Sequence, residues 1–161
     1  MSVYQLHRKQ FLPISLDTAW EFFSSPHNLK EITPPDMAMT VLNDSAREKM
    51  FAGQVISYHV SPLMGLKLFW LTEITHVKDR EYFVDEQRVG PYALWHHLHR
   101  FREVPGGVEM EDIVHYQLPL GPLGWIAHAL FVRQKLEGIF DYRLKVLVGI
   151  FGVQTSVSMI E

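Results

Sequence analysis

Apolar side chains recur at helical spacing over residues 121–151, and this pattern predicts the longest helix of the chain. Pro122 stands near its first turn and Gly152 follows its last apolar residues, as at typical helix ends. At about 1.5 Å per residue such a helix is about 45 Å long. Gly138 in its interior costs about 1 kcal/mol relative to Ala, and close packing against a sheet would explain it. The apolar stripe comprises Ile126, Ala129, Leu130, Leu136, Ile139, Phe140, Leu147, Ile150 and Phe151.

The N-terminal pattern predicts a strand followed by two short helices. The strand covers residues 3–12 and ends at Pro13. Ser15 or Asp17 can cap the first helix, which Ser25-Pro26 ends because the residue before proline avoids the helical region. Residues 28–32 form the second helix. The double proline at 34–35 stops it.

Strand-like segments fill the middle of the chain, at residues 37–42, 55–60, 66–77, 82–89, 94–104 and 108–118. Their short connections predict antiparallel neighbours. The fold class is therefore α+β: a curved seven-stranded antiparallel sheet with two short helices, gripping a long C-terminal helix. One domain over residues 1–152 and a tail over residues 153–161 are expected.

Alternate residues of a strand share a face, so polar groups can be assigned to the inner side of this sheet. The outer positions are charged: Glu86, Arg88, Arg100, Arg102, Glu109 and Glu111. The inner positions combine large apolar residues with Asp85, Gln87, His97, His99, Asp112 and Tyr116. A buried polar group without a partner costs about 1–3 kcal/mol. These groups therefore either satisfy one another, with Asp112 holding His97 or His99, or face a cavity.

The histidine-rich run at 96–99 has the composition of a metal site, but His96 points away from His97 and His99 in a strand. His97, His99 and one carboxylate could form a facial metal triad. A hydrogen-bonded His–Asp pair is the favoured interpretation, and no metal or cofactor is expected. No G-x-S-x-G, P-loop or G-x-G-x-x-G sequence occurs.

Composition narrows the function classes further. The chain has 161 residues, no cysteine, and a net charge of −3 from 15 basic and 18 acidic residues. Disulfides and thiolate metal sites are excluded, and the absence of a basic run argues against nucleic acid. The N-terminal residues lack the apolar core of a signal peptide, and no run of about 18 apolar residues predicts a membrane span. A cytoplasmic protein, monomeric or homodimeric, is expected.

The order of elements and several motifs resemble the START-like, helix-grip superfamily (SRPBCC), which includes birch-pollen-allergen-like and polyketide cyclase/dehydrase-like proteins. The resemblance covers nearly all of residues 1–152. Its motifs are the segment at 11–35, Gly90-Pro91-Tyr92, Trp95-x-His97-x-His99-x-Phe101, the segment from Met110 to Gly121 with Asp112 and Tyr116, and the final helix with Leu136, Phe140, Tyr142 and Arg143. It implies a deep cavity between sheet and final helix for lipids, quinones or polyketides. It carries no shared catalytic set.

The sequence thus predicts a protein that binds a hydrophobic small molecule, for transport or sensing. Its apolar walls would be Trp70, Phe83, Trp95, Phe101, Leu136 and Phe140, and its polar end Asp85, Gln87, His97, His99, Asp112 and Tyr116. The alternative is a cyclase/dehydratase-type enzyme in which His97 or His99 works with Asp112 or Asp85 as an acid–base pair. A third hypothesis is an interaction module whose pocket is filled by side chains.

Overall fold

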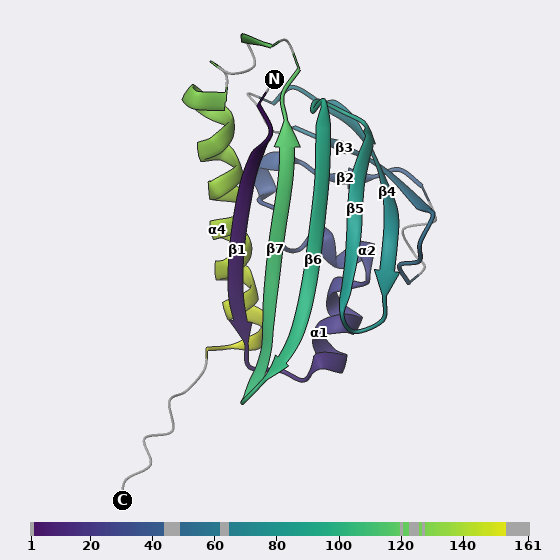
Figure 1. Ribbon diagram of the computed structural model, residues 1–161, viewed down its shortest axis with the longest axis vertical. Helices are drawn as coiled ribbons and strands as arrows, with labels where there is room; N and C mark the ends of the chain where they lie inside the picture. Colours follow the sequence, from purple (N-terminus) through teal and green to yellow (C-terminus); the bar gives the residue numbers. More distant parts are fainter. Residues whose placement is uncertain are drawn as a thin grey trace, which may run out of the picture.

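The computed structural model describes residues 2–43, 49–61, 65–119, 121–122, 126 and 128–153. Seven strands form one antiparallel sheet in the order β1-β7-β6-β5-β4-β3-β2. In Figure 1 the sheet curves around α1 and α2, and α4 runs beside β1. The chain therefore has the helix-grip architecture that the sequence predicts. The strands are β1 Tyr4–Leu12, β2 Thr40–Val41, β3 Gln54–Val60, β4 Leu68–Lys78, β5 Tyr82–Val89, β6 Leu94–Val104 and β7 Gly107–Gln117.

Strands β6 and β7 are the longest continuous ladder of the sheet and fix its register. They are joined by a tight turn at Pro105 and Gly106, where Gly106 takes a φ of 84°. On their outer face Arg100 lies opposite Glu111 and forms an ion pair with it at 3.1 Å. The inner face of β7 is buried at every second residue. The alternation in the sequence therefore assigns inside and outside correctly.

Helix α1 (Leu16–Phe23) closes one end of the sheet. The Ser15 hydroxyl caps it by accepting a hydrogen bond from the backbone N–H of Thr18. Its buried face packs Trp20 edge-on against Phe101 of β6, with ring centroids 5.7 Å apart. The spacing of apolar residues on α1 thus places the main core cluster between this helix and the sheet.

Two short elements after α1 differ from the sequence-based prediction. Helix α2 covers Pro26–Leu29 instead of 28–32, because Pro26 occupies a first-turn position where its missing N–H costs nothing. The predicted strand at 37–42 is wrong over most of its length. A 3-10 turn, η1 (Pro35–Met37), and a left-handed Ala38 with a φ of 44° leave only β2 extended.

The C-terminal helix contains a π-helical turn that the sequence does not predict. Helix α4 covers Arg133–Phe151 and follows a π-helical turn, η3 (His128–Val132). Pro122 and Ile126 are also helical, whereas residues 120, 123–125 and 127 lie outside the described residues. The wider π turn changes the phase of the helix, so the predicted stripe does not run along its whole length. Ile126, Leu130 and Ile150 are exposed, and the buried positions of α4 are Leu136, Phe140, Arg143 and Leu147.

Gly138 does not have the role that the sequence analysis gave it. It is exposed on α4, and a Cβ added there would meet no atom within 4 Å. Close packing against the sheet is therefore wrong as its explanation. The predicted tail lies outside the described residues beyond Val153. Among the described helices, none combines the length and apolar character needed to cross a membrane.

Candidate functional site

A cavity of about 370 Å³ lies between the inner face of the sheet and helix α4. This volume is within the usual range of small-molecule sites, about 300–1,000 Å³. Most of its lining is aliphatic, aromatic or thioether, contributed by strands β3 to β6, by α2 and by α4. Representative apolar lining residues are Met37, Met39, Ile56, Trp70, Trp95 and Ile139.

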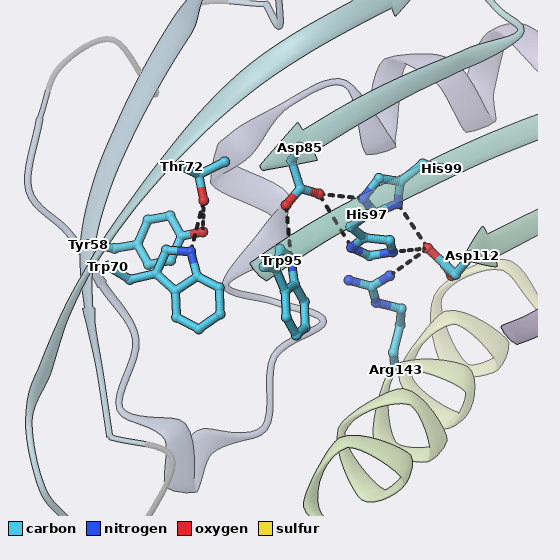
Figure 2. Close-up of polar contacts among 9 residues, drawn as sticks. All are labelled: Tyr58, Trp70, Thr72, Asp85, Trp95, His97, His99, Asp112 and Arg143. Carbon is cyan, nitrogen blue, oxygen red and sulfur yellow. Dashed lines mark hydrogen bonds and ion pairs between the residues drawn. The ribbon is translucent and has the colours of Figure 1, made fainter. Parts of the chain in front are cut away.

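One wall of the cavity carries a compact cluster of charged and titratable side chains (Figure 2). His97 and His99 come from β6, with ring centroids 3.7 Å apart, because alternate residues of a strand project to the same side. Asp85 of β5 and Asp112 of β7 flank them. His97 Nε2 lies 2.9 Å from Asp112 Oδ1, and its Nδ1 lies 3.3 Å from Asp85 Oδ2. His99 Nε2 lies 2.9 Å from Asp85 Oδ2, and its Nδ1 lies 2.9 Å from Asp112 Oδ1.

Arg143 completes the cluster from the opposite layer. Its Nη1 donates a hydrogen bond to Asp112 Oδ1 at 3.2 Å, and its guanidinium lies over the Phe140 ring at 4.9 Å. Its Nε and the Nδ1 of His99 are buried without a hydrogen-bond partner among the described residues. Sequence reasoning did not assign Arg143 to the site. A signal existed, because Arg143 stands three residues after Phe140 and four before Leu147, within the buried stripe of α4.

The ionisation of the cluster follows from competition between burial and charge pairing. Burial alone raises the pKa of Asp112, but the charge of Arg143 and the two neighbouring histidines outweigh it, so that pKa falls well below its usual range. Burial likewise opposes ionisation of Asp85, yet His97 and His99 lower its pKa. For His97, burial lowers the pKa, whereas Asp85 and Asp112 raise it, and the net shift is upward. Both carboxyl groups are therefore ionised at neutral pH.

These charges nearly cancel within the cluster. The two carboxylates contribute −2 and Arg143 contributes +1, so one protonated histidine brings the sum to zero. His97 has a carboxylate oxygen within 3.3 Å of each ring nitrogen, an arrangement that favours its protonated form. The cluster is therefore a balanced ion-pair network at the edge of an apolar cavity.

A second polar group lies on the β3–β4 side of the same cavity. The Tyr58 hydroxyl lies 2.6 Å from Thr72 Oγ1, and Trp70 Nε1 donates to the same oxygen at 2.9 Å. Burial is the main cause that raises the pKa of Tyr58, so the phenol remains protonated at neutral pH. Sequence reasoning placed Trp70 in the cavity wall and missed Tyr58 and Thr72 as polar members of the site. The inward alternation along β3 and β4 was the available signal.

The structure separates the predicted site residues into two sets. Those that line the cavity are Trp70, Phe83, Asp85, Trp95, His97, His99, Leu136 and Phe140. The other four lie behind or beside this lining. Gln87 holds the backbone N–H and C=O of Tyr92, and Phe101 packs among Trp20, Phe23 and Phe83. Asp112 supports the histidines, and Tyr116 contacts Tyr4, Tyr92 and Trp95.

Three members of the cluster also have the composition of a metal site. Asp85, His97 and His99 each offer one ligand atom, and these atoms lie within 4.8 Å of one another. The same carboxylate oxygens and imidazole nitrogens could also hold the polar end of an organic molecule. The wall of the cavity therefore offers donor atoms suited to an inorganic or an organic ligand.

Comparison with solved structures shows which fold this is. No protein-family model matches the chain, and no curated protein matches its sequence. The chain is similar in structure to TTHA0849 from Thermus thermophilus, with a TM-score of 0.70, 16% identity, and coverage of 89% of this chain and 94% of that one. Ginseng major latex-like protein 151 from Panax ginseng gives 0.67 at 12% identity, covering 92% and 97%. Ara h 8.0201 gives 0.60 at 16% identity, covering 92% and 99%.

This chain has the START-like, helix-grip fold. The expected resemblance to birch-pollen-allergen-like and SRPBCC proteins is thereby confirmed at the level of structure. Identities this low show the fold only, so the chemistry of the site is argued from this chain's own residues.

Proposed function

We propose that this protein binds a hydrophobic small molecule with one polar end in the cavity between the sheet and α4. The observation that carries the proposal is the uneven lining of that cavity. Its walls are mostly apolar. Apart from Lys135, which forms an ion pair with Asp36, its charged and titratable groups are gathered at Asp85, His97, His99 and Arg143. An apolar body would contact the walls through the hydrophobic effect, while the cluster would orient a polar group.

The two polar groups give the bound molecule a defined direction. Trp95 stands between them, because its Nε1 donates to Asp85 Oδ1 at 3.3 Å and its ring packs edge-on against Trp70 at 5.3 Å. A ligand that reaches from the charged cluster to Tyr58 would pass this aromatic pair. Trp95 is thus a wall residue whose loss would enlarge the cavity and remove contact area.

The direct test is binding of an apolar fluorescent dye to the purified protein. Wild type is expected to bind one dye molecule per chain, and long-chain acids or quinones are expected to displace it. Trp95→Ala should weaken dye binding at least tenfold, while Phe69→Ala, on the outer face of β4 where the side chain is exposed, should leave it unchanged. Equal affinity in both variants would contradict the proposed cavity.

A second candidate function is acid–base catalysis, which the placement of His97 and His99 on the cavity wall favours. Asp112 holds the Nε2 of His97, and such pairs orient a catalytic imidazole. Turnover of a cyclisable or dehydratable substrate, with a bell-shaped pH–rate profile lost in His97→Ala, would support this candidate. If wild type binds ligand without turnover, this candidate fails and the proposed ligand-binding function remains.

A further inference from the structure

We propose that Asp85, His97 and His99 form a binding site for a divalent transition-metal ion. Two histidines and one carboxylate, with further coordination positions open, make up the facial triad of non-haem iron sites. The three residues come from two adjacent strands and converge on the cavity wall (Figure 2). The proposal does not depend on an organic ligand and adds an inorganic one to the same wall.

Two of the three spacings between the ligand atoms fit such an ion, and all three atoms lie within 4.8 Å of one another. Metal–nitrogen and metal–oxygen bonds of about 2.0–2.2 Å place neighbouring ligand atoms about 3 Å apart. Asp85 Oδ2 lies 2.9 Å from His99 Nε2 and 3.3 Å from His97 Nδ1. Both ring nitrogens therefore lie close to one carboxylate oxygen. An ion can enter between them when this oxygen retreats toward the cavity.

The support behind the three ligands is the stronger argument. In protein metal sites a ligating histidine usually directs its other ring nitrogen to a carboxylate or carbonyl oxygen. Here the remaining nitrogens, His97 Nε2 and His99 Nδ1, both lie 2.9 Å from Oδ1 of Asp112. Arg143 in turn donates to that oxygen.

The carboxylate ligand has its own support. Trp95 Nε1 donates to Asp85 Oδ1, which leaves Oδ2 directed toward the two histidines. Asp85 and His97 therefore each have a second polar atom hydrogen-bonded to a neighbouring side chain, whereas His99 Nδ1 lies beside Asp112 without a hydrogen bond.

The donor set indicates the class of ion. Imidazole and carboxylate suit Zn²⁺, Fe²⁺, Co²⁺ and Ni²⁺, whereas Mg²⁺ and Ca²⁺ prefer oxygen ligands. Three protein ligands leave coordination positions open, as in catalytic metal sites. These positions would face the cavity, where water or the polar end of a bound molecule could complete the coordination.

The experiment uses chelator-treated full-length protein without any organic ligand. Titration with Zn²⁺ is expected to show one ion per chain, and titration with Co²⁺ a visible absorption spectrum of nitrogen and oxygen ligation. His99→Ala should weaken binding at least 100-fold. The matched control is His96→Ala. His96 precedes His97 on β6 and lies on the opposite face of the sheet, where its ring packs near His115. The affinity of this variant should equal that of wild type.

Two results of the titrations would overturn the proposal. One is wild-type protein that takes up no Zn²⁺ or Co²⁺ at one ion per chain, which would establish a metal-free ion-pair network. The other is equal affinity in His99→Ala and His96→Ala.

Should His99→Ala fail to fold, Co²⁺ bound to wild type decides the matter, because it should broaden the imidazole resonances of His97 and His99 and spare those of His7 and His76. Broadening of the outer imidazoles instead would also overturn it. Dye binding measured in the presence of chelator tests the proposed ligand-binding function separately.

Discussion

Asp112 lies directly opposite His99 in the β6–β7 register, yet it accepts its hydrogen bond from His97, at 2.9 Å. Asp85, the other carboxylate, also bonds to the histidine that is not its register partner. Asp85 lies opposite His97 in the β5–β6 register and bonds to His99 Nε2, also at 2.9 Å. Because each carboxylate spans both histidines, removal of one member disturbs the whole cluster.

Asp112→Asn is therefore expected to destabilise the protein by about 3 kcal/mol. Removal of one partner from a buried ion pair leaves an uncompensated charge, here that of Arg143. Urea unfolding followed by circular dichroism measures the change in the free energy of unfolding. The matched control is Glu109→Gln, which breaks the surface pairs with Arg102 and Lys9 and should cost about 0–1 kcal/mol. A loss no larger than that of the control would contradict the buried network.

The stability of the metal-free protein should fall on both sides of neutral pH. Asp85 and Asp112 have lowered pKa values in the folded state, so their contribution is present above the usual carboxyl value of 3.8 and is lost as pH falls through the folded values. His97 has a raised pKa, so its contribution is complete below 6.5 and is lost as pH rises through its folded value.

The measurement is the free energy of unfolding in urea and chelator between about pH 3 and about pH 9. Imidazole NMR resonances test whether the loss of stability at alkaline pH comes from His97. The titratable and charged groups around His97 are Asp85, Asp112, His99 and Arg143. A His97 resonance that titrates below 6.5 would contradict the raised value.

Gly138→Ala should raise the free energy of unfolding by about 1 kcal/mol, because alanine loses less backbone entropy in a helix and the new methyl group meets open space. Thermal unfolding provides the measurement. Gly107→Ala is the contrasting variant, since its Cβ would clash with the carbonyl oxygen of Leu12. It should destabilise the protein. The opposite order of the two melting temperatures would refute the packing at these two glycines.

Ile139→Trp should reduce dye affinity at least tenfold by filling the cavity from α4. Leu144→Trp adds the same side chain to α4 at an exposed position and should not affect binding. Fluorescence titration compares the two variants with wild type. Retained affinity in Ile139→Trp would place the dye outside the cavity.

Much of the fold was readable from local patterns. The alternation along β6 and β7 assigned His97, His99 and Asp112 to one face because successive strand residues point to opposite sides. The short elements after α1 were read less well. Pro35 and the left-handed Ala38 override the apolar pattern of residues 37–42, and no periodicity reports such a local conformation.

The sequence by itself determined the sheet, its inward face and the presence of a closing helix, since these depend on periods of two and about 3.6 residues. Only the tertiary structure decided that Arg143 from α4 reaches Asp112, and that each carboxylate spans two histidines. It also decided that Gly138 faces open space. The physical reason is that strand register and the rotation of a helix about its axis are fixed by packing between segments far apart in the chain.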